Sequence, residues 1–295
     1  MTEKNFFTEA RTILFLIYRN QNNIKETTYF MQTFSDLIDG AERECARNGY
    51  KLEVEYLDRQ AIEMKVEMLS HEDQGGILLL ATEMTDDQIE LFLNLNLPLV
   101  VLDHPLNELK KDNIIMDNER GIKEALKYLR AQHHKKIGYL HVVNEITNLK
   151  ERFECFCRFG RELNFQISED NVIQMSGCLS DELYWELMER FQKIQEMPTA
   201  FLMDNDVIAI CAMKVLRELG YDLPEEISLI GFDDIELARK VEPPLTTIYS
   251  SRYEMGVKGV NKLLFLISGK TEPKEQIRLK TFLIIRESVA NLEET

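Results

Sequence analysis

The chain has 295 residues, of which 44% are hydrophobic and 29% charged, an ordinary composition for a globular protein with a sizeable core. Its net charge is 35 − 51 = −16, and its most basic stretch, HHKK at 133–136, is too short to bind a phosphate backbone, so direct binding to DNA is not expected. No apolar run reaches the length of a membrane span, and the apolar segment at 13–18 lacks the features of a signal peptide, so we expect a cytoplasmic protein.

Short apolar strands alternate with amphipathic helices along most of the chain. Strands are predicted at 12–17, 51–56, 76–81, 98–103, 113–117, 136–143, 171–175, 199–203, 227–232, 246–251 and 281–287. Helices are predicted at 28–47, 60–70, 85–94, 118–132, 150–163, 181–195, 206–219 and 252–267. The strands are continuous apolar runs, which is typical of parallel sheets covered on both faces. Two successive βαβαβ series therefore predict an α/β fold with two doubly wound subdomains.

The segments after residue 243 do not fit a simple division into two halves. Pro243-Pro244 precedes one of the last strands, and SGKTEPK (268–274) precedes the other. Both segments suit connections that cross from one subdomain to the other.

Polar residues follow several of the predicted strands, where open parallel sheets bind their ligands. The candidates are Tyr18 and Arg19 after the first strand, Asp103 at the end of the fourth, Arg152 after the strand at 136–143, Asn205 after 199–203, and Asp233 after 227–232. Carboxylates, an amide and a guanidinium group suit a polyhydroxylated small molecule, whose hydroxyls both donate and accept hydrogen bonds.

Structural roles remain open for the same residues. Asp233 could form a capping box with Glu236, either Asp204 or Asn205 could cap the helix at 206–219, and Arg152 could be a solvated surface charge.

Catalytic and metal-binding motifs are absent from the sequence. It contains no GxSxG, GxxxxGK[ST], GxGxxG or HExxH pattern, so no catalytic residue and no cofactor is predicted. The five cysteines are scattered, and Cys155-Phe156-Cys157 has no second pair or neighbouring histidine to complete a metal site. We expect reduced, buried thiols and no enzyme activity.

The run DNDVIAICAMKVLRELGYDLPEEISLIGFDDIELARKVEPPLTTI, which ends at Ile248, resembles the effector-binding core of the LacI/GalR (lactose/galactose repressor) family of transcription regulators. DNERGIKEALKYLRAQHHKKIGYL (117–140), ERFECF (151–156) and LIIRES (283–288) extend the resemblance over nearly the whole chain. It implies two Rossmann-like subdomains of the type I periplasmic-binding-protein kind, joined by three crossovers near 136–137, 246–251 and 275–280. The implied N-terminal subdomain is 11–136 plus 249–276 and the C-terminal one 137–248 plus 277–291, with 1–10 disordered or a linker remnant.

The resemblance also implies which residues contact an effector. The family's contacts correspond to Asp103, Arg152, Asn205 and Asp233, with positions 18–20 facing the same cleft. Leu179 stands where the family often has an aromatic platform for a sugar ring, and Tyr18 or Phe30 could replace it. Arg19 would accommodate an anionic or phosphorylated effector. The sequence departs from the family at Cys155 and His133, both of which replace glycines.

By this resemblance the chain is a dimerisation core in which a sugar or sugar derivative, bound in the cleft between the subdomains, controls DNA binding by an N-terminal helix-turn-helix domain. Because the first strand is predicted at about residue 12, we expect that domain to be absent here. Partners are then a small-molecule effector such as a sugar or sugar phosphate and a second copy of the chain, with no membrane contact. A free-standing solute-binding protein of a transporter and a small glycoside hydrolase that uses two cleft carboxylates stay open as alternatives.

Overall fold

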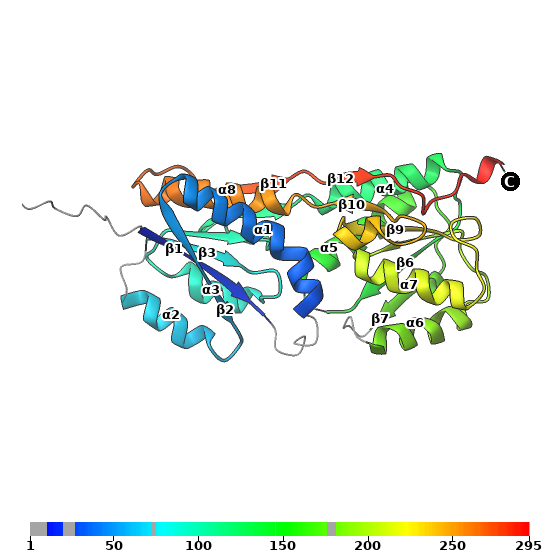
Figure 1. The fold of residues 1–295 in the computed structure, drawn as a ribbon, viewed down its shortest axis with the longest axis horizontal. Helices are drawn as coiled ribbons and strands as arrows, with labels where there is room; N and C mark the ends of the chain where they lie inside the picture. The colour runs from blue at the N-terminus through cyan, green and yellow to red at the C-terminus, as the bar shows by residue number, and fades with distance from the viewer. Residues whose placement is uncertain (1–10, 20–26, 72–74, 145, 176–180, 295) are drawn as a thin grey trace, which may run out of the picture. The chain divides into compact units, whose positions relative to one another are not determined.

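The computed structural model describes residues 11–19, 27–71, 75–144, 146–175 and 181–294. Contacts between Cα atoms divide them into two compact units. The first contains 11–19, 36–115 and 252–277, and the second contains 27–35, 116–251 and 278–294. Each unit is described by itself below, with the labels of Figure 1.

The first unit is built on a six-stranded sheet with the order β11-β5-β4-β3-β1-β2. Its strands are β1 (Arg11–Tyr18), β2 (Tyr50–Leu57), β3 (Ile77–Leu80), β4 (Leu99–Leu102), β5 (Asp112–Met116) and β11 (Gln276–Leu279). Its helices are α2 (Ile62–His71), α3 (Asp86–Leu93), α8 (Arg252–Ile267) and residues 36–47 of α1 (Thr27–Arg47), whose residues 27–35 are grouped with the second unit. The pairs β1–β2, β1–β3, β3–β4 and β4–β5 are parallel.

Both faces of this sheet are covered by helices. Ile77 and Leu79 of β3 pack into one core with residues of α2 and α3. The alternate residues Leu78 and Leu102 lie against α8 on the opposite face. Every residue of β3 and β4 is buried, which explains why these strands are apolar throughout instead of alternating.

The second unit is built on a sheet with the order β12-β10-β9-β8-β6-β7. Its strands are β6 (Ile137–Val142), β7 (Val172–Met175), β8 (Ala200–Met203), β9 (Ser228–Asp233), β10 (Thr246–Tyr249) and β12 (Phe282–Ile284). Its helices are α4 (Asn118–Ala131), α5 (Thr147–Glu162), α6 (Asp181–Lys193) and α7 (Asp206–Glu218), with short 3-10 turns at Glu169–Asn171, Glu236–Arg239 and Leu292–Glu294. The paired strands from β7 to β10 are parallel, whereas the edge strand β12 runs antiparallel to β10.

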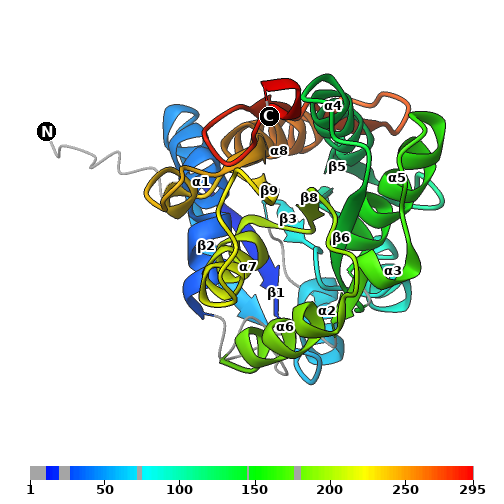
Figure 2. The same ribbon diagram turned by 90° about the vertical axis from the view of Figure 1, so that its right-hand side faces the viewer.

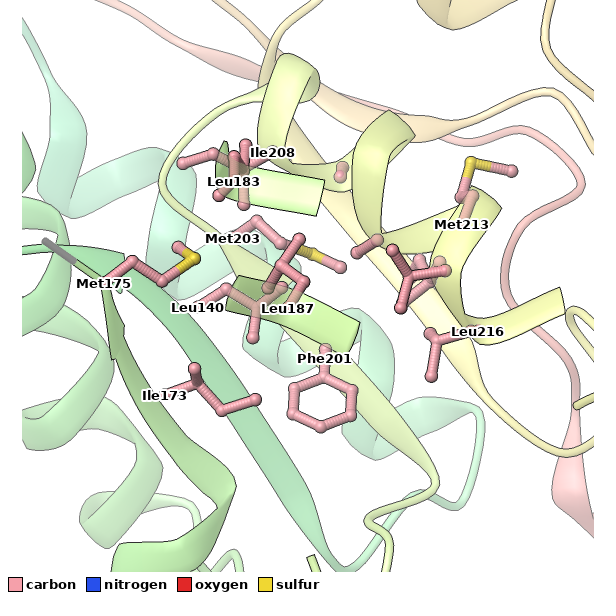
Figure 3. Close-up of a cluster of buried hydrophobic side chains, with 14 of the residues drawn as sticks. Leu140, Ile173, Met175, Leu183, Leu187, Phe201, Met203, Ile208, Met213 and Leu216 are labelled. Atoms are coloured by element: carbon pink, nitrogen blue, oxygen red, sulfur yellow. The ribbon is translucent and has the colours of Figure 1, made fainter. Parts of the chain in front are cut away.

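Helices also cover both faces of the second sheet (Figure 2). On one face, Leu140, Phe201 and Met203 pack against α6 and α7, as the close-up of this core in Figure 3 shows. On the other face, Tyr139 and Leu202 pack against α4 and α5. The expected α/β architecture with two mainly parallel sheets is confirmed.

One boundary between the units differs from the sequence-based division. The sequence placed residues up to 136 in the N-terminal subdomain, but contacts group residues from 116 onward, including α4, with the second unit. Helix α4 lies so close to the second sheet that a Cβ atom added at Gly121 would come within 2.7 Å of Ile248 Cγ2. The pattern of a connecting helix shows that one of its faces is apolar but does not show which sheet that face covers.

Among the described residues, no helix is both long enough and apolar enough to cross a membrane.

Candidate functional site

Arg152 is the centre of a polar cluster at the carboxyl-end edge of the second sheet. It lies in α5 and is only 2% exposed. Its Nε donates to Asn118 Oδ1 at 2.9 Å and its Nη1 donates to the backbone oxygen of Asp204 at 2.6 Å. The guanidinium group stacks on the Phe232 ring, with Cζ 3.5 Å from the ring centroid, and Nη2 lies 3.6 Å from Asp233 Oδ1. Arg152 is therefore a buried, oriented cation and not a solvated surface charge.

A second shell of hydrogen bonds orients Asn118. Its Nδ2 donates to Asn148 Oδ1 at 2.9 Å and to Glu151 Oε2 at 2.7 Å, which leaves its Oδ1 to accept from Arg152. The N-cap of α4 is the preceding residue, Asp117, whose carboxylate accepts from Arg120 N. Asn118 instead holds Arg152 in place, a role that the sequence analysis did not assign to it.

Asp233 ends β9 with a backbone φ of 109°, and Asp234 follows with a φ of 55°. Both values lie in the left-handed region, which residues other than glycine rarely occupy. The capping role considered for Asp233 is wrong, because the 3-10 turn at Glu236–Arg239 has Ile235 at its N-cap and no side-chain cap. Asp233 is 7% exposed and faces Arg152, so the structure brings these two predicted site residues together.

Asp206 fixes the chain directly after Asp233. Its Oδ2 accepts from Ile235 N at 2.9 Å, and its Oδ1 accepts from the Thr247 hydroxyl. Burial raises the pKa of Asp206 well above its usual range, and the nearby charge of Asp233 raises it further. A Cβ at Gly231 would lie 2.1 Å from Asp206 Oδ1, so this carboxyl group fits only against a glycine.

Asn205 has the structural role that the sequence left open. Its Oδ1 accepts from Ile208 N at 3.0 Å, so Asn205 is the N-cap of α7. The capping hypothesis is confirmed for this residue. Asn205 is 4% exposed and directly follows Asp204, whose backbone oxygen binds Arg152.

Asp103 is the corresponding strand-end residue of the first unit. It follows β4 with a φ of 63° and is 1% exposed. Its Oδ2 accepts from the Thr82 hydroxyl at 2.8 Å and lies 3.5 Å from Nη1 of Arg252, the first residue of α8. Arg252 was missed by the sequence analysis, because a single arginine at the start of a helix carries no distinctive signal.

Tyr18 and Arg19 lie at the end of β1, as predicted. The Tyr18 hydroxyl accepts from Gln88 Nε2 at 3.1 Å, and the Arg19 guanidinium lies over the Tyr56 ring at 4.2 Å from its centroid. Phe30 belongs to α1, but its side chain is outside the described residues, and so is the whole of Leu179.

A large open groove of the second unit lies elsewhere. It has a volume of about 1110 Å³, runs along the edge strand β7, and is lined by residues such as Val143, Phe153 and Arg190. None of the predicted site residues whose side chains the structure describes lines it, so the candidate site is the buried polar cluster and not this open groove. Within the described part of the chain, no group of three or more His, Cys, Asp or Glu side chains is arranged to hold a metal ion.

The cluster can bind a small polar molecule, since it offers an oriented guanidinium group and carboxylates that are already desolvated. Such groups favour ligands that donate and accept hydrogen bonds at several positions.

Comparison with known proteins assigns the chain to a family. A model of the periplasmic binding protein-like domain matches residues 126–289. The chain is 35% identical over 260 residues to the HTH-type transcriptional repressor PurR of Pasteurella multocida, which covers 87% of this chain and 77% of that protein. It is 34% identical over 273 residues to PurR of Haemophilus influenzae (strain PittEE), covering 90% and 80%.

Solved structures share the fold. The complex of the transcriptional regulator CelR with cellobiose has a TM-score of 0.82 at 22% identity, covering 94% of this chain and 84% of that one. The lac repressor dimer bound to operator and the anti-inducer ONPF has a TM-score of 0.81 at 22% identity, covering 96% of each chain. A LacI family regulator from Enterococcus faecium with bound ribose has a TM-score of 0.77 at 26% identity, covering 96% and 100%.

These relatives are transcriptional repressors and not enzymes, so the glycoside hydrolase alternative is not favoured. The chain belongs to the periplasmic binding protein-like family and forms the effector-binding core of a LacI/GalR-type transcription regulator.

Proposed function

We propose that this chain binds a sugar or sugar derivative as its effector and that the bound effector controls DNA binding by a helix-turn-helix domain. The observation that carries the proposal is the pairing of buried Arg152 with Asp233 at the carboxyl end of β9. A LacI family regulator of the same fold contains ribose, and CelR contains cellobiose.

The polar groups of this pair are oriented before any ligand arrives. Arg152 uses one N–H to bind Asn118 and another to bind Asp204, and the remaining guanidinium N–H groups are suited to ligand oxygens. Asp233 is suited to accept from ligand hydroxyls. An effector that satisfies both groups loses little affinity to side-chain ordering, since the protein has already ordered them.

We propose further contacts at the remaining strand ends. In the first unit these are Asp103 and Tyr18, with Arg19 available for an anionic substituent. In the second unit Asn205 would contact the effector through its Nδ2, because its Oδ1 is used by the helix cap. Phe30 and Leu179 stay in the proposal as the positions for an apolar contact with a sugar ring.

We also propose that the protein acts as a homodimer in the bacterial cytoplasm. The lac repressor, which shares the fold, is a dimer on its operator, and the sequence relatives are HTH-type repressors. A net charge of −16 does not favour contact between this core and phosphate groups, which supports DNA binding through a separate domain. Sedimentation-velocity analysis tests the assembly, and a sedimenting monomer at micromolar concentration would refute it.

A thermal-shift screen tests the effector class. The panel contains D-ribose, cellobiose and other neutral sugars, sugar phosphates, and purine bases and nucleosides as a second class of small molecule. A ligand at a hundred times its Kd adds about 2.7 kcal/mol to the free energy of unfolding, which raises Tm measurably. Stabilisation by a sugar or sugar phosphate supports the proposal, and stabilisation by purine compounds alone refutes the sugar assignment.

Variants of the pair then locate the binding site. Asp233→Asn and Arg152→Met should each weaken binding of the stabilising sugar by about 10-fold to 100-fold, because each removes a hydrogen bond to a charged group. Glu236→Gln is the matched control, since Glu236 lies three residues from Asp233 but is exposed and pairs with Lys240. Normal affinity in both site variants would show that the effector binds elsewhere.

A further inference from the structure

His141 and Asp204 form a buried pair beside Arg152 that the proposed function does not use. His141 lies in β6 and Asp204 directly follows β8. The His141 Nδ1 atom is 3.0 Å from Asp204 Oδ2, and the Asp204 side chain is completely buried. The Phe153 ring stacks on the His141 ring, with centroids 4.5 Å apart and an interplanar angle of 12°. The orientation of the imidazole is therefore fixed by two contacts: the hydrogen bond at Nδ1 and the packing of the Phe153 ring on its face.

The hydrogen bonds determine which nitrogen of His141 carries the proton. Asp204 Oδ1 accepts from the Tyr139 hydroxyl at 2.9 Å, and Oδ2 accepts from Val142 N at 2.6 Å. Because both oxygens of Asp204 accept hydrogen bonds, the imidazole nitrogen beside Oδ2 is assigned as the donor of that contact. Burial and the charge of Asp204 raise the pKa of Tyr139 well above its usual range, which keeps that hydroxyl a donor. His141 is consequently the Nδ1–H tautomer, and its Nε2 is an acceptor when the ring is neutral.

His141 is connected through Asp204 to Arg152, one of the proposed effector contacts. Asp204 links the two groups, because its backbone oxygen accepts from Arg152 Nη1 while its carboxylate holds His141. Among the described residues no hydrogen bond involves His141 Nε2, and 8% of the His141 side-chain surface stays accessible.

We propose that His141 is a specificity-determining residue that accepts a hydrogen bond at Nε2 from a hydroxyl or N–H group of the effector. Asp204 is its positioning residue, because it fixes the tautomer that makes Nε2 an acceptor. The inference rests on the proposed function and adds one requirement to it: the effector has a hydrogen-bond donor at this point. An analogue whose donor there is replaced by an ether oxygen is rejected, because two acceptors then face each other.

Two substitutions of His141 distinguish a contact between His141 and the effector from the hydrogen bond between His141 and Asp204. In His141→Asn the side-chain amide reaches the Nδ1 position and still donates to Asp204, but nothing reaches the Nε2 position. In His141→Gln the longer side chain reaches the Nε2 position and its amide oxygen can accept there. If His141 contacts the effector, His141→Asn should lower the affinity for the stabilising sugar of the panel about 10-fold. His141→Gln should keep that affinity within about 3-fold of the wild-type value.

Isothermal titration calorimetry with that sugar and a thermal melt without ligand give the two readouts. A purely structural His141 predicts the opposite order, since Asn preserves the bond to Asp204 and Gln does not. Unchanged affinity in His141→Asn, or equal losses in both variants, would overturn the inference while leaving the proposed function intact. If no sugar or sugar phosphate binds the wild type, the proposed function fails, and the inference fails with it.

A ligand-free measurement tests the tautomer. Long-range ¹⁵N–¹H NMR spectra distinguish a protonated from an unprotonated nitrogen in each imidazole, and His141→Asn identifies the signals of His141 among the five histidines. In the neutral ring we expect a protonated Nδ1 and an unprotonated Nε2. A protonated Nε2 with an unprotonated Nδ1 would overturn the assignment of an acceptor, whatever the effector is.

Discussion

Lowering the pH from 7 to 5 should destabilise this protein through one buried histidine. His134 is 0% exposed, with Nε2 3.2 Å from Ala290 O and Nδ1 2.9 Å from Thr199 Oγ1. A neutral imidazole satisfies both contacts when Nε2–H donates to the carbonyl and Nδ1 accepts from the hydroxyl. Burial lowers the pKa of His134 from 6.5 to about 4, although the bond to Ala290 opposes that change.

The sign and size of the effect follow from linkage. Between pH 6.5 and about 4 the unfolded chain binds a proton at His134 and the folded protein does not, so stability falls as the pH falls. The pKa difference of 6.5 − 4 limits the total loss to about 3 kcal/mol, of which about 2 kcal/mol is lost between pH 7 and pH 5. The full contribution of the neutral imidazole is present above pH 6.5.

Urea unfolding at pH 7 and pH 5 measures this loss. The wild type is compared with His134→Gln, which keeps a donor for Ala290 but does not titrate, and with His71→Gln, which replaces an exposed histidine. Carboxylates contribute equally to all three proteins, so the difference between the two pH values should be about 2 kcal/mol smaller in His134→Gln only. An equal pH dependence in the wild type and His134→Gln would refute the reasoning.

Substitutions at three further positions test the backbone geometry by urea unfolding at pH 7. Gly231→Ala should cost about 3 kcal/mol, because its Cβ would lie 2.1 Å from Asp206 Oδ1, and a normal unfolding midpoint would contradict that close approach. His133→Gly should stabilise the protein by about 1 kcal/mol, because His133 has a φ of 66° where glycine is unstrained, and an unchanged midpoint would count against the strain. Asn205→Ala should cost about 1 kcal/mol through loss of the cap to Ile208 N, whereas Asn205→Ser should cost less, and equal losses would argue against capping.

The strand-end residues show how far a local pattern predicts a site. Asp103 and Asp233 were found because each follows a run of buried apolar residues, and the carboxyl ends of such strands meet at one edge of a sheet. The pattern did not reveal that both have positive φ values, since that conformation depends on the contacts that hold the turn. Whether they bind an effector stays a prediction.

Arg152 shows a signal that was present but not used. It shares one helical face with Leu149, Phe156 and Phe159, all of which are buried, so its spacing placed a cation on the apolar side of α5. A charge on that face needs a buried partner, which could have been predicted. The identity of the partners could not, because Asn118 and Asp233 are 34 and 81 residues away in the chain.

The sequence by itself determined the α/β class, the strands and helices, and the strand ends that carry polar groups, because these depend on residue periodicity over a few neighbours. The tertiary structure decided that α4 packs on the second sheet, that β12 runs antiparallel, and that His141 meets Asp204. Each of these depends on contacts between segments distant in the chain, and local periodicity is the same whichever distant partner a segment finds.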